Sequence, residues 1–369
     1  MDCEKQSLLD MGAFEEMDLP PGERTVGLKW VFDYKMDSEG KVILGKEKAC
    51  LVTQGFSQWP GQYDETYAPV AKMTSVRVLL AWAVVRDLDI FQFDCKSAFL
   101  HAKLRHPMYA CPFPGYPASS PTKVLRILAA LYGLRQSAYE FYILICTLLL
   151  ALGMVRCKVD HGVFMGEWTA PPHPSIAMPS DGCPLVLYVP LHVDDGLAIT
   201  NLPSLYAWFL STLSARLHVV DLGQCSKFLN VLILCDRSAR RLWLSSHLYV
   251  TELLEEWNLS NCRTASTSFP SNFSDLPQAP PTSIPSVSDA DLMPQYQRLV
   301  GCLLYFAITT TCPDLSFYAM WLGQFNAKPT RNNFLVAKHV LRYLAGTCML
   351  ALCLGAPSPR VPQTLSGYV

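Results

Sequence analysis

The stretch LHVDDGLAIT, residues 191–200, places two adjacent aspartates, Asp194 and Asp195, inside an apolar segment with the composition of a buried β-strand. Burying one carboxylate without a partner costs free energy, and burying two neighbouring carboxylates costs more. Gly196 follows directly and suits a sharp turn, so the sequence favours a hairpin whose tip carries the pair. A divalent cation would offset both charges, because Mg²⁺ prefers hard oxygen ligands. By itself the pair is a weak signal, since adjacent aspartates usually lie in exposed turns.

A third aspartate has the same context. Asp94 ends a short apolar stretch, IFQFD at 90–94, which we interpret as a strand. Two strand-end carboxylates that lie side by side in a sheet could hold two metal ions about 3.5–4 Å apart, the arrangement used for in-line phosphoryl transfer. Asp94 is therefore the leading candidate for a further ligand of a metal site that contains Asp194 and Asp195, although the spacing alone favours a turn or an exposed edge without a metal.

The composition limits the class of protein. The chain has 369 residues, of which 50% are hydrophobic and 17% charged, so it can bury a sizeable core in about two or three domains or subdomains. The net charge of −1 gives no support for nucleic-acid binding by bulk charge, so any such surface must be local. The fourteen cysteines form no CxxC pair, which leaves no legible zinc or redox motif. We interpret them as reduced thiols, because no secretory signal opens the chain.

Periodicity and turn residues predict several elements. We expect a hairpin from Lys29 with its turn at 38–40, a helix from Thr74 to about Val85, and a helical stretch after Ser97. The apolar run at 141–155 has 15 residues, short of the roughly 20 that a membrane span needs, so we predict a buried helix and no membrane partner. A proline-rich loop at 168–184 separates two strands, one of which carries the aspartate pair.

An ordered series of blocks resembles the reverse transcriptase of copia-type long-terminal-repeat retrotransposons. The resemblance runs nearly end to end, and the order of so many blocks makes it specific. The blocks include KACLVTQGFSQWPGQYDETYAPV from Lys48, QFDCKSAFLHAKL from Gln92, ALYGLRQS from Ala130, HVDDGLAIT from His192, VVDLGQCSKFLNVLI from Val219 and YQRLVGCLLYFAITTTCPDLSFYA from Tyr296.

The resemblance implies an α+β right-hand polymerase with fingers, palm and thumb, an antiparallel palm sheet and a helical C-terminal part. It implies a domain order of fingers and palm at 1–263, a Ser/Thr/Pro-rich linker at 264–289 and a helical thumb-like or connection-like segment at 290–356. Residues 357–369 would then be a truncated lead-in to a missing ribonuclease H domain.

The resemblance also assigns roles to single residues. Asp94 matches the first catalytic aspartate, and Asp194 and Asp195 match the catalytic pair, with Asp195 as the lesser metal ligand. Phe99 falls where the family places an aromatic ring beneath the nucleotide sugar, which would reject a 2′-hydroxyl group. An ordinary core position is the competing interpretation of Phe99.

Three further positions follow from the same comparison of blocks. Lys48 matches a fingers residue that meets the triphosphate, where a cation is favourable; a solvated strand charge is the alternative. Gln136 matches a glutamine near the incoming nucleotide. Phe228 and Leu229, in KFLN, resemble the hairpin that grips the primer end, although an ordinary hairpin pair would look the same.

Several positions depart from the family pattern. Cys50 stands where an arginine is usual, and a thiol does not replace the planar donor fork of arginine. His192 stands in place of the usual tyrosine before the aspartate pair, and Asn230 in place of the glycine of the primer-grip hairpin. These departures leave open that the chain is a degenerate fragment.

Two functions are therefore carried forward. The first is RNA-directed DNA polymerase of a copia-type retrotransposon, which uses two Mg²⁺ ions, with Mn²⁺ as an alternative, to transfer nucleotides from dNTPs to a primer 3′-hydroxyl group. The second is a catalytically degenerate fragment that at most binds RNA or an RNA–DNA hybrid. The family implies an RNA template, a DNA primer, fusion to integrase and ribonuclease H regions that are absent from the sequence, and a cytoplasmic virus-like particle.

Overall fold

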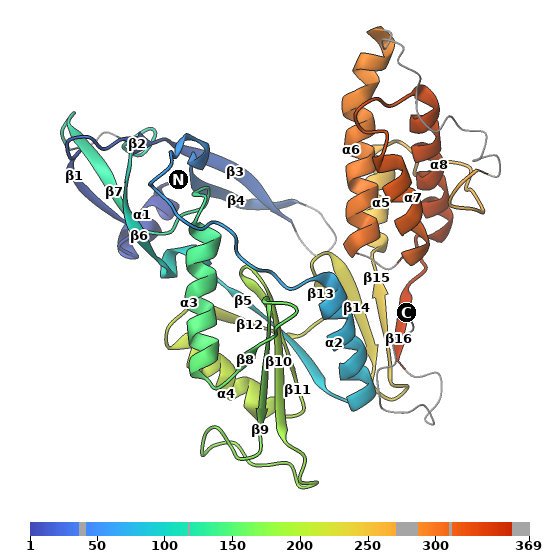
Figure 1. The fold of residues 1–369 in the computed structure, drawn as a ribbon, viewed down its shortest axis with the longest axis horizontal. Coiled ribbons are helices and arrows are strands. Elements are labelled where there is room, and N and C mark those ends of the chain that lie inside the picture. Colours follow the sequence, from blue (N-terminus) through green and yellow to red (C-terminus); the bar gives the residue numbers. More distant parts are fainter. Residues whose placement is uncertain (37–41, 117–118, 271–286, 310–311, 356–369) are drawn as a thin grey trace. The chain divides into compact units, whose positions relative to one another are not determined.

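The computed structural model describes residues 1–36, 42–116, 119–270, 287–309 and 312–355 (Figure 1). The chain divides into two compact units. The first consists of Met1–Ser75 and Asp89–Gly223, and the second of Val76–Leu88 and the described residues from Gln224 onward. Both units combine helices with antiparallel sheet, so the fold is α+β as expected. No helix within the described ranges is both long enough and apolar enough to cross a membrane.

A six-stranded sheet forms the centre of the first unit, in the order β12-β5-β11-β10-β9-β8. Helices α3 and α4 share one core with it, because residues at helical spacing on α3 (Phe141, Ile145, Leu149) and inward residues of the strands are buried together. The elements are β5 (Asp89–Cys95), α3 (Ser137–Ala151), β8 (Val155–Arg156), β9 (Val163–Trp168), β10 (Leu185–His192), β11 (Asp195–Thr200), α4 (Pro203–Ser214) and β12 (Val219–Gln224).

The helix expected at 141–155 is α3, which begins at Ser137 and ends at Ala151. It is not apolar throughout, since its buried Glu140 forms an ion pair with Arg105, with 3.1 Å between the nearest atoms. Strands β9 and β10 pair antiparallel, and the segment between them contains neither helix nor strand. Ile176 anchors this segment, because its side chain is buried in the core of the six-stranded sheet.

A second sheet of the first unit has the order β1-β7-β6-β2, and a separate hairpin pairs β3 with β4. The helical stretch expected after Ser97 is a single 3₁₀ turn, η2, followed by β6, so the helix prediction is wrong there. Ser97 has a φ of 52°, which ends the preceding strand in a tight turn and leaves no room for a regular helix start. The elements are α1 (Asp2–Asp10), β1 (Phe14–Asp18), β2 (Thr25–Val26), β3 (Leu28–Met36), β4 (Val42–Thr53), η1 (Gly55–Ser57), η2 (Ala98–His101), β6 (Lys103–Ala110) and β7 (Lys123–Ala129).

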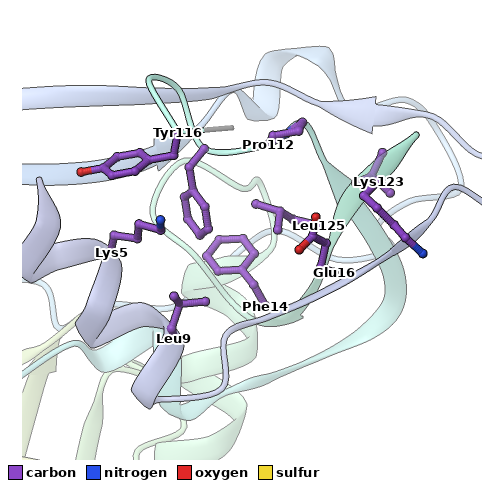
Figure 2. Close-up of a pocket in the computed structure, with 10 residues that line it drawn as sticks. Lys5, Leu9, Phe14, Glu16, Pro112, Tyr116, Lys123 and Leu125 are labelled. Atoms are coloured by element: carbon purple, nitrogen blue, oxygen red, sulfur yellow. The ribbon is translucent and has the colours of Figure 1, made fainter. Parts of the chain in front are cut away.

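A cavity of about 200 Å³ lies between α1, β1, β7 and the segment after β6 (Figure 2). Phe14 and Phe113 meet edge to face in its wall, with ring centroids 5.1 Å apart. The Lys5 ammonium group lies 4.0 Å from the centroid of the Tyr116 ring. Glu16 accepts two hydrogen bonds from Ser119. The charged groups around this cavity thus have partners within the chain.

The second unit combines a four-stranded sheet, β13-β14-β15-β16, with a helical bundle. The bundle has its own core, formed by apolar residues of α5, α6, α7 and α8. The elements are α2 (Met73–Arg86), which belongs to this unit from Val76, β13 (Lys227–Phe228), β14 (Val231–Asp236), β15 (Arg241–Ser245), α5 (His247–Glu256), α6 (Val287–Thr309), η4 (Pro313–Leu315), α7 (Ser316–Gly323), α8 (Arg331–Thr347) and β16 (Leu352–Gly355).

The two compact units do not test the predicted functional division into residues 1–263, 264–289 and 290–356. That division stays a prediction. Most of the predicted linker, residues 271–286, lies outside the described residues, as does the predicted lead-in at 357–369.

Candidate active site

Strand register brings the predicted carboxylates to one end of the six-stranded sheet. Asp195, the first residue of β11, pairs directly with Asp94 of β5. Residues that face each other in an antiparallel pair project from the same side of the sheet, so the two carboxylates share a face. Asp194 lies in the turn before β11, and its carbonyl oxygen accepts a hydrogen bond of 2.9 Å from the Cys95 N–H group. The direct cross-strand partner of Asp94 is thus Asp195.

The turn that carries Asp194 is a two-residue hairpin connection between His192 and Asp195, which pair with each other. Val193, its first central residue, has a φ of 59°, as a type II′ turn requires. A β-branched residue rarely adopts this conformation, which costs about 1–3 kcal/mol. Val193 lines a small apolar cavity together with Ala68, Pro69, Val70, Leu191 and four residues of α3.

Asp195 is half-buried and lies beside two like charges, those of Asp194 and Asp94. Burial raises the pKa of Asp195 to about 6, with further contributions from Asp194 and Asp94, while the ammonium group of Lys96 acts in the opposite direction. Burial likewise raises the pKa of the Cys95 thiol to about 12, and all three aspartates add to this shift. The end of the sheet is therefore a site of concentrated negative charge.

Lys96 and His192 lie beside the aspartates. Oδ2 of Asp94 is buried and forms an ion pair with the Lys96 ammonium group. Burial lowers the pKa of His192, although Asp194 opposes the shift. Nδ1 of His192 is buried and has no hydrogen-bond partner within the described residues.

The donor set suits a hard divalent cation, although the side chains are not arranged around one. In the part of the chain that the structure describes, no group of three or more His, Cys, Asp and Glu side chains has an arrangement that could hold a metal ion. The available donors are carboxylate oxygens, which Mg²⁺ prefers. A bound cation would offset the charges of Asp194 and Asp94, which add to the effect of burial on the pKa of Asp195. The residues present therefore fit Mg²⁺ in their chemistry.

Phe99 and Tyr132 form an aromatic pair close to the aspartates. Their ring centroids lie 4.6 Å apart, and Phe99 also contacts Phe141 edge to face at 6.3 Å. Burial raises the pKa of Tyr132 to about 12, and the charges of Asp194 and Asp94 contribute, which places its hydroxyl group near both. The sequence reasoning missed Tyr132, although it lies in the quoted block ALYGLRQS.

Gln136 lies in a buried amide network. Only 3% of its surface is exposed, and its Oε1 accepts a hydrogen bond of 2.9 Å from Nε2 of Gln58. Oε1 of Gln58 in turn accepts from the backbone N–H group of Arg135, whose side chain donates to the carbonyl oxygen of Gly55. The network fixes the LRQS segment against the segment that follows β4. The predicted contact of Gln136 with a nucleotide stays a prediction.

Lys48 and Cys50 lie two residues apart on β4. The Cα atoms of Lys48 and Asp33 are paired in the β3–β4 hairpin, and Cys50 pairs with Val31. The side chain of Lys48 lies outside the described part of the structure. Cys50 is close enough to Tyr132 for its charge to contribute to the raised pKa of that residue. The position where the family usually carries arginine is thus near the aromatic pair.

Phe228 and Leu229 belong to the second unit, whereas the aspartates belong to the first. Phe228 is buried and pairs with Val231 across the β13–β14 hairpin. Leu229 and Asn230 form the two-residue connection with φ values of 49° and 63°, as a type I′ turn requires. Asparagine tolerates this conformation, which explains how Asn230 can replace a glycine.

Comparisons with known proteins identify the family of this chain. Residues 12–270 match the family model described as "Reverse transcriptase (RNA-dependent DNA polymerase)". The chain is 31% identical over 370 residues to the "Retrovirus-related Pol polyprotein from transposon TNT 1-94" of Nicotiana tabacum, covering 100% of this chain and 26% of that protein. It is 33% identical over 333 residues to the corresponding polyprotein from transposon RE1 of Arabidopsis thaliana, covering 89% of this chain and 21% of that protein.

Among solved structures, the chain is similar to a foamy viral protease-reverse transcriptase in complex with double-stranded DNA. The similarity has a TM-score of 0.43 and 12% identity, and it covers 93% of this chain and 48% of that one. The chain spans about a quarter of the length of the polyproteins named above. On the family match and these relatives, the chain belongs to the reverse transcriptase (RNA-dependent DNA polymerase) family, in its copia-type retrotransposon form.

Proposed function

We propose that the chain is an RNA-directed DNA polymerase that extends a DNA primer on an RNA template. The primer 3′-hydroxyl group attacks the α-phosphorus of a bound deoxynucleoside triphosphate, a new phosphodiester bond forms, and pyrophosphate leaves. The observation that carries the proposal is the meeting of Asp94, Asp194 and Asp195 at the end of one sheet. Burial there, together with the charges of Asp194 and Asp94, raises the pKa of Asp195.

The three aspartates would hold two Mg²⁺ ions, with Asp94 and Asp194 as the principal ligands and Asp195 as the lesser one. When bound, such ions activate the attacking hydroxyl group and stabilise the leaving pyrophosphate. The aspartates themselves supply the negative charge that retains the cations, and the Cys95–Asp194 backbone hydrogen bond fixes the turn against β5.

The aromatic pair is the proposed floor of the nucleotide site. Phe99 packs against both Tyr132 and Phe141, which limits the movement of its ring. A ribonucleotide 2′-hydroxyl group would clash with it, which would select deoxynucleotides. Lys48 would meet the triphosphate from β4, and Gln136 would support the same site from its buried amide network.

Primer extension tests the proposal. Purified protein is given poly(rA)/oligo(dT), labelled dTTP and Mg²⁺, beside the variants Asp194→Asn and Asp181→Asn. Asp181 is a matched control, because it is an exposed aspartate in the loop between β9 and β10. We expect incorporation by the wild type and by Asp181→Asn, and loss of incorporation by Asp194→Asn. Full activity of Asp194→Asn would contradict the metal assignment.

A second candidate function is a degenerate fragment that binds RNA or an RNA–DNA hybrid without copying it. Cys50 favours this candidate, because a thiol near Tyr132 replaces an arginine that could contact phosphate. It predicts salt-sensitive template binding that Asp194→Asn leaves unchanged. Metal-dependent incorporation by the wild type would exclude it.

The wider context follows from the relatives alone. Because the relatives are Pol polyproteins several times longer than this chain, we propose that the activity operates beside integrase and ribonuclease H regions. We further propose that copying takes place in a cytoplasmic virus-like particle.

A further inference from the structure

A closed ring of hydrogen bonds lies directly behind the aspartate hairpin. It involves Asp160, between β8 and β9; Gly162; Leu191, the penultimate residue of β10; and the segment Ala71–Lys72 that precedes α2. Leu191 is separated from Asp194 by only two residues, so the ring lies at the base of the turn that carries the catalytic pair.

Four hydrogen bonds close the ring. The Asp160 carboxylate accepts from the N–H group of Lys72 at 2.9 Å and from the N–H group of Gly162 at 3.1 Å. The carbonyl oxygen of Gly162 accepts from the N–H group of Leu191 at 2.8 Å, and the carbonyl oxygen of Leu191 accepts from the N–H group of Ala71 at 2.7 Å. Both backbone groups of Leu191 are thereby fixed.

The ring depends on the absence of a side chain at Gly162. A Cβ atom at this position would lie 2.1 Å from the backbone nitrogen of Ala71 and 2.3 Å from the carbonyl carbon of Val70. Those atoms are backbone and cannot move aside as a flexible side chain can. The same approach places Val70 against the apolar cavity that Val193 lines.

The two carboxylate oxygens of Asp160 accept the two hydrogen bonds that it contributes to the ring. Its side chain is 4% exposed, and a buried carboxylate is costly unless hydrogen bonds compensate it. Both of its partners are N–H donors, so two acceptor oxygens are needed. Asparagine would offer one acceptor and would set its own NH₂ group against the second donor.

We propose that Asp160 is a positioning residue for the aspartate hairpin. It acts through Gly162, Leu191 and Ala71 to hold the turn with Asp194 and the start of β11, where Asp195 lies opposite Asp94. The proposal rests on the polymerase function proposed above. Displacing reacting groups by about 1 Å can cost on the order of a hundredfold in rate. The expected signature of a lost ring is therefore a slower chemical step with unchanged substrate binding.

The test uses Asp160→Asn in the full chain and measures single-turnover incorporation of dTTP together with hydrogen exchange in peptides that cover residues 185–200. We expect a rate about 10- to 100-fold lower, with dTTP and template–primer affinities within about twofold of the wild type. Exchange at Leu191 should become faster. Asp160→Ser, which keeps one acceptor and needs less space, is the second variant if Asp160→Asn does not fold.

Two controls separate positioning from general loss of stability. Leu213→Ala removes a buried side chain of α4 in the same unit and should lower stability without slowing incorporation. Gly162→Ala breaks the same ring, so its effect on the rate should not add to that of Asp160→Asn. Additive effects, or an equal loss of rate in Leu213→Ala, would overturn the proposal.

Different results would contradict the polymerase function and the positioning role of Asp160. If the wild type incorporates no nucleotide, the polymerase function fails, and hydrogen exchange alone decides whether Asp160 holds the hairpin. If the wild type is active and Asp160→Asn retains its rate, the positioning role fails and the polymerase function stands.

Discussion

Replacing Gly196 by alanine should destabilise the sheet at the point where the aspartates meet. A Cβ atom at this position would lie 2.2 Å from Cζ of Phe93, its cross-strand partner. Ordinary carbon contacts are about 3.5–4 Å, so the ring would have to retreat by about 1 Å or more. It has no free path, because Phe93 is fully buried and packs edge to face on Phe209 at 5.5 Å.

The expected loss of stability follows from two opposing terms. Overpacking a filled core costs about 1–3 kcal/mol. Replacing glycine by alanine returns about 0.4–1 kcal/mol, because the unfolded chain loses freedom. We therefore expect Gly196→Ala to lower the free energy of unfolding of the first unit by about 1–2 kcal/mol. Since Asp195 adjoins Gly196 and Asp94 adjoins Phe93, incorporation should fall as well.

The assay is a urea titration in which unfolding is monitored by hydrogen exchange of peptides from β5 and β11. These peptides report on the first unit alone. Gly301→Ala, within α6, is the matched control, because no atom of another element in the described ranges lies within 4 Å of the place that an alanine Cβ would take. Alanine should therefore stabilise that helix, which belongs to the second unit, by about 0.5–1 kcal/mol, as peptides of α6 would report, and should leave exchange in β5 and β11 unchanged. On a Phe93→Leu background, Gly196→Ala should cost about 1 kcal/mol less. An unchanged denaturation midpoint for Gly196→Ala would refute the close approach of Gly196 and Phe93.

Three other predictions address charge, turn geometry and the family departures. Because the folded-state pKa of Asp195, about 6, exceeds its ordinary value of 3.8, metal-free protein should lose stability as pH rises from 3.8 to 6. Solvent screens this partly exposed group, so we expect Asp195→Asn to be more stable than the wild type by only about 1 kcal/mol at pH 7. Near pH 3.5 the two proteins should be equally stable, and urea denaturation midpoints measured in EDTA would show both results. Leu229→Gly should relieve the left-handed conformation at Leu229 and raise stability by about 1 kcal/mol while weakening primer binding, which thermal unfolding and primer titration would separate. Cys50→Arg should restore a phosphate-binding fork and lower the KM for dTTP severalfold in primer extension; an unchanged KM would exclude phosphate contact at this position.

Local sequence signals predicted much of the secondary structure around the site. IFQFD and the apolar residues on either side of the aspartate pair have strand composition, and β5, β10 and β11 lie there. The register that sets Asp195 rather than Asp194 opposite Asp94 could not be predicted, because a shift of one residue leaves the same composition and changes every partner.

The surroundings of three residues could not be predicted, because they depend on contacts between segments that are distant in the sequence. Gln136 looks like a surface amide in LRQS, yet it is buried because Gln58, 78 residues away, supplies its hydrogen bond. Asp160 resembles a turn residue until Gly162 is seen to approach the backbone of Ala71. Tyr132 carries no local signal of nearby charge, since Asp94 and Asp194, which add to the effect of burial on its pKa, lie far from it in the sequence.

The placement of α2 has a consequence for how the chain folds during synthesis. Residues 76–88 are flanked on both sides by segments of the first unit but belong to the second. Arg237 and Arg240, from the β14–β15 connection, form ion pairs with Asp87 at the end of this segment. On the ribosome, α2 therefore emerges long before these partners exist, with an apolar face of Val76, Leu80, Ala83 and Val84 awaiting cover. The nascent chain must keep this face from aggregating until translation passes residue 240, so the second unit should depend on chaperones more than the first.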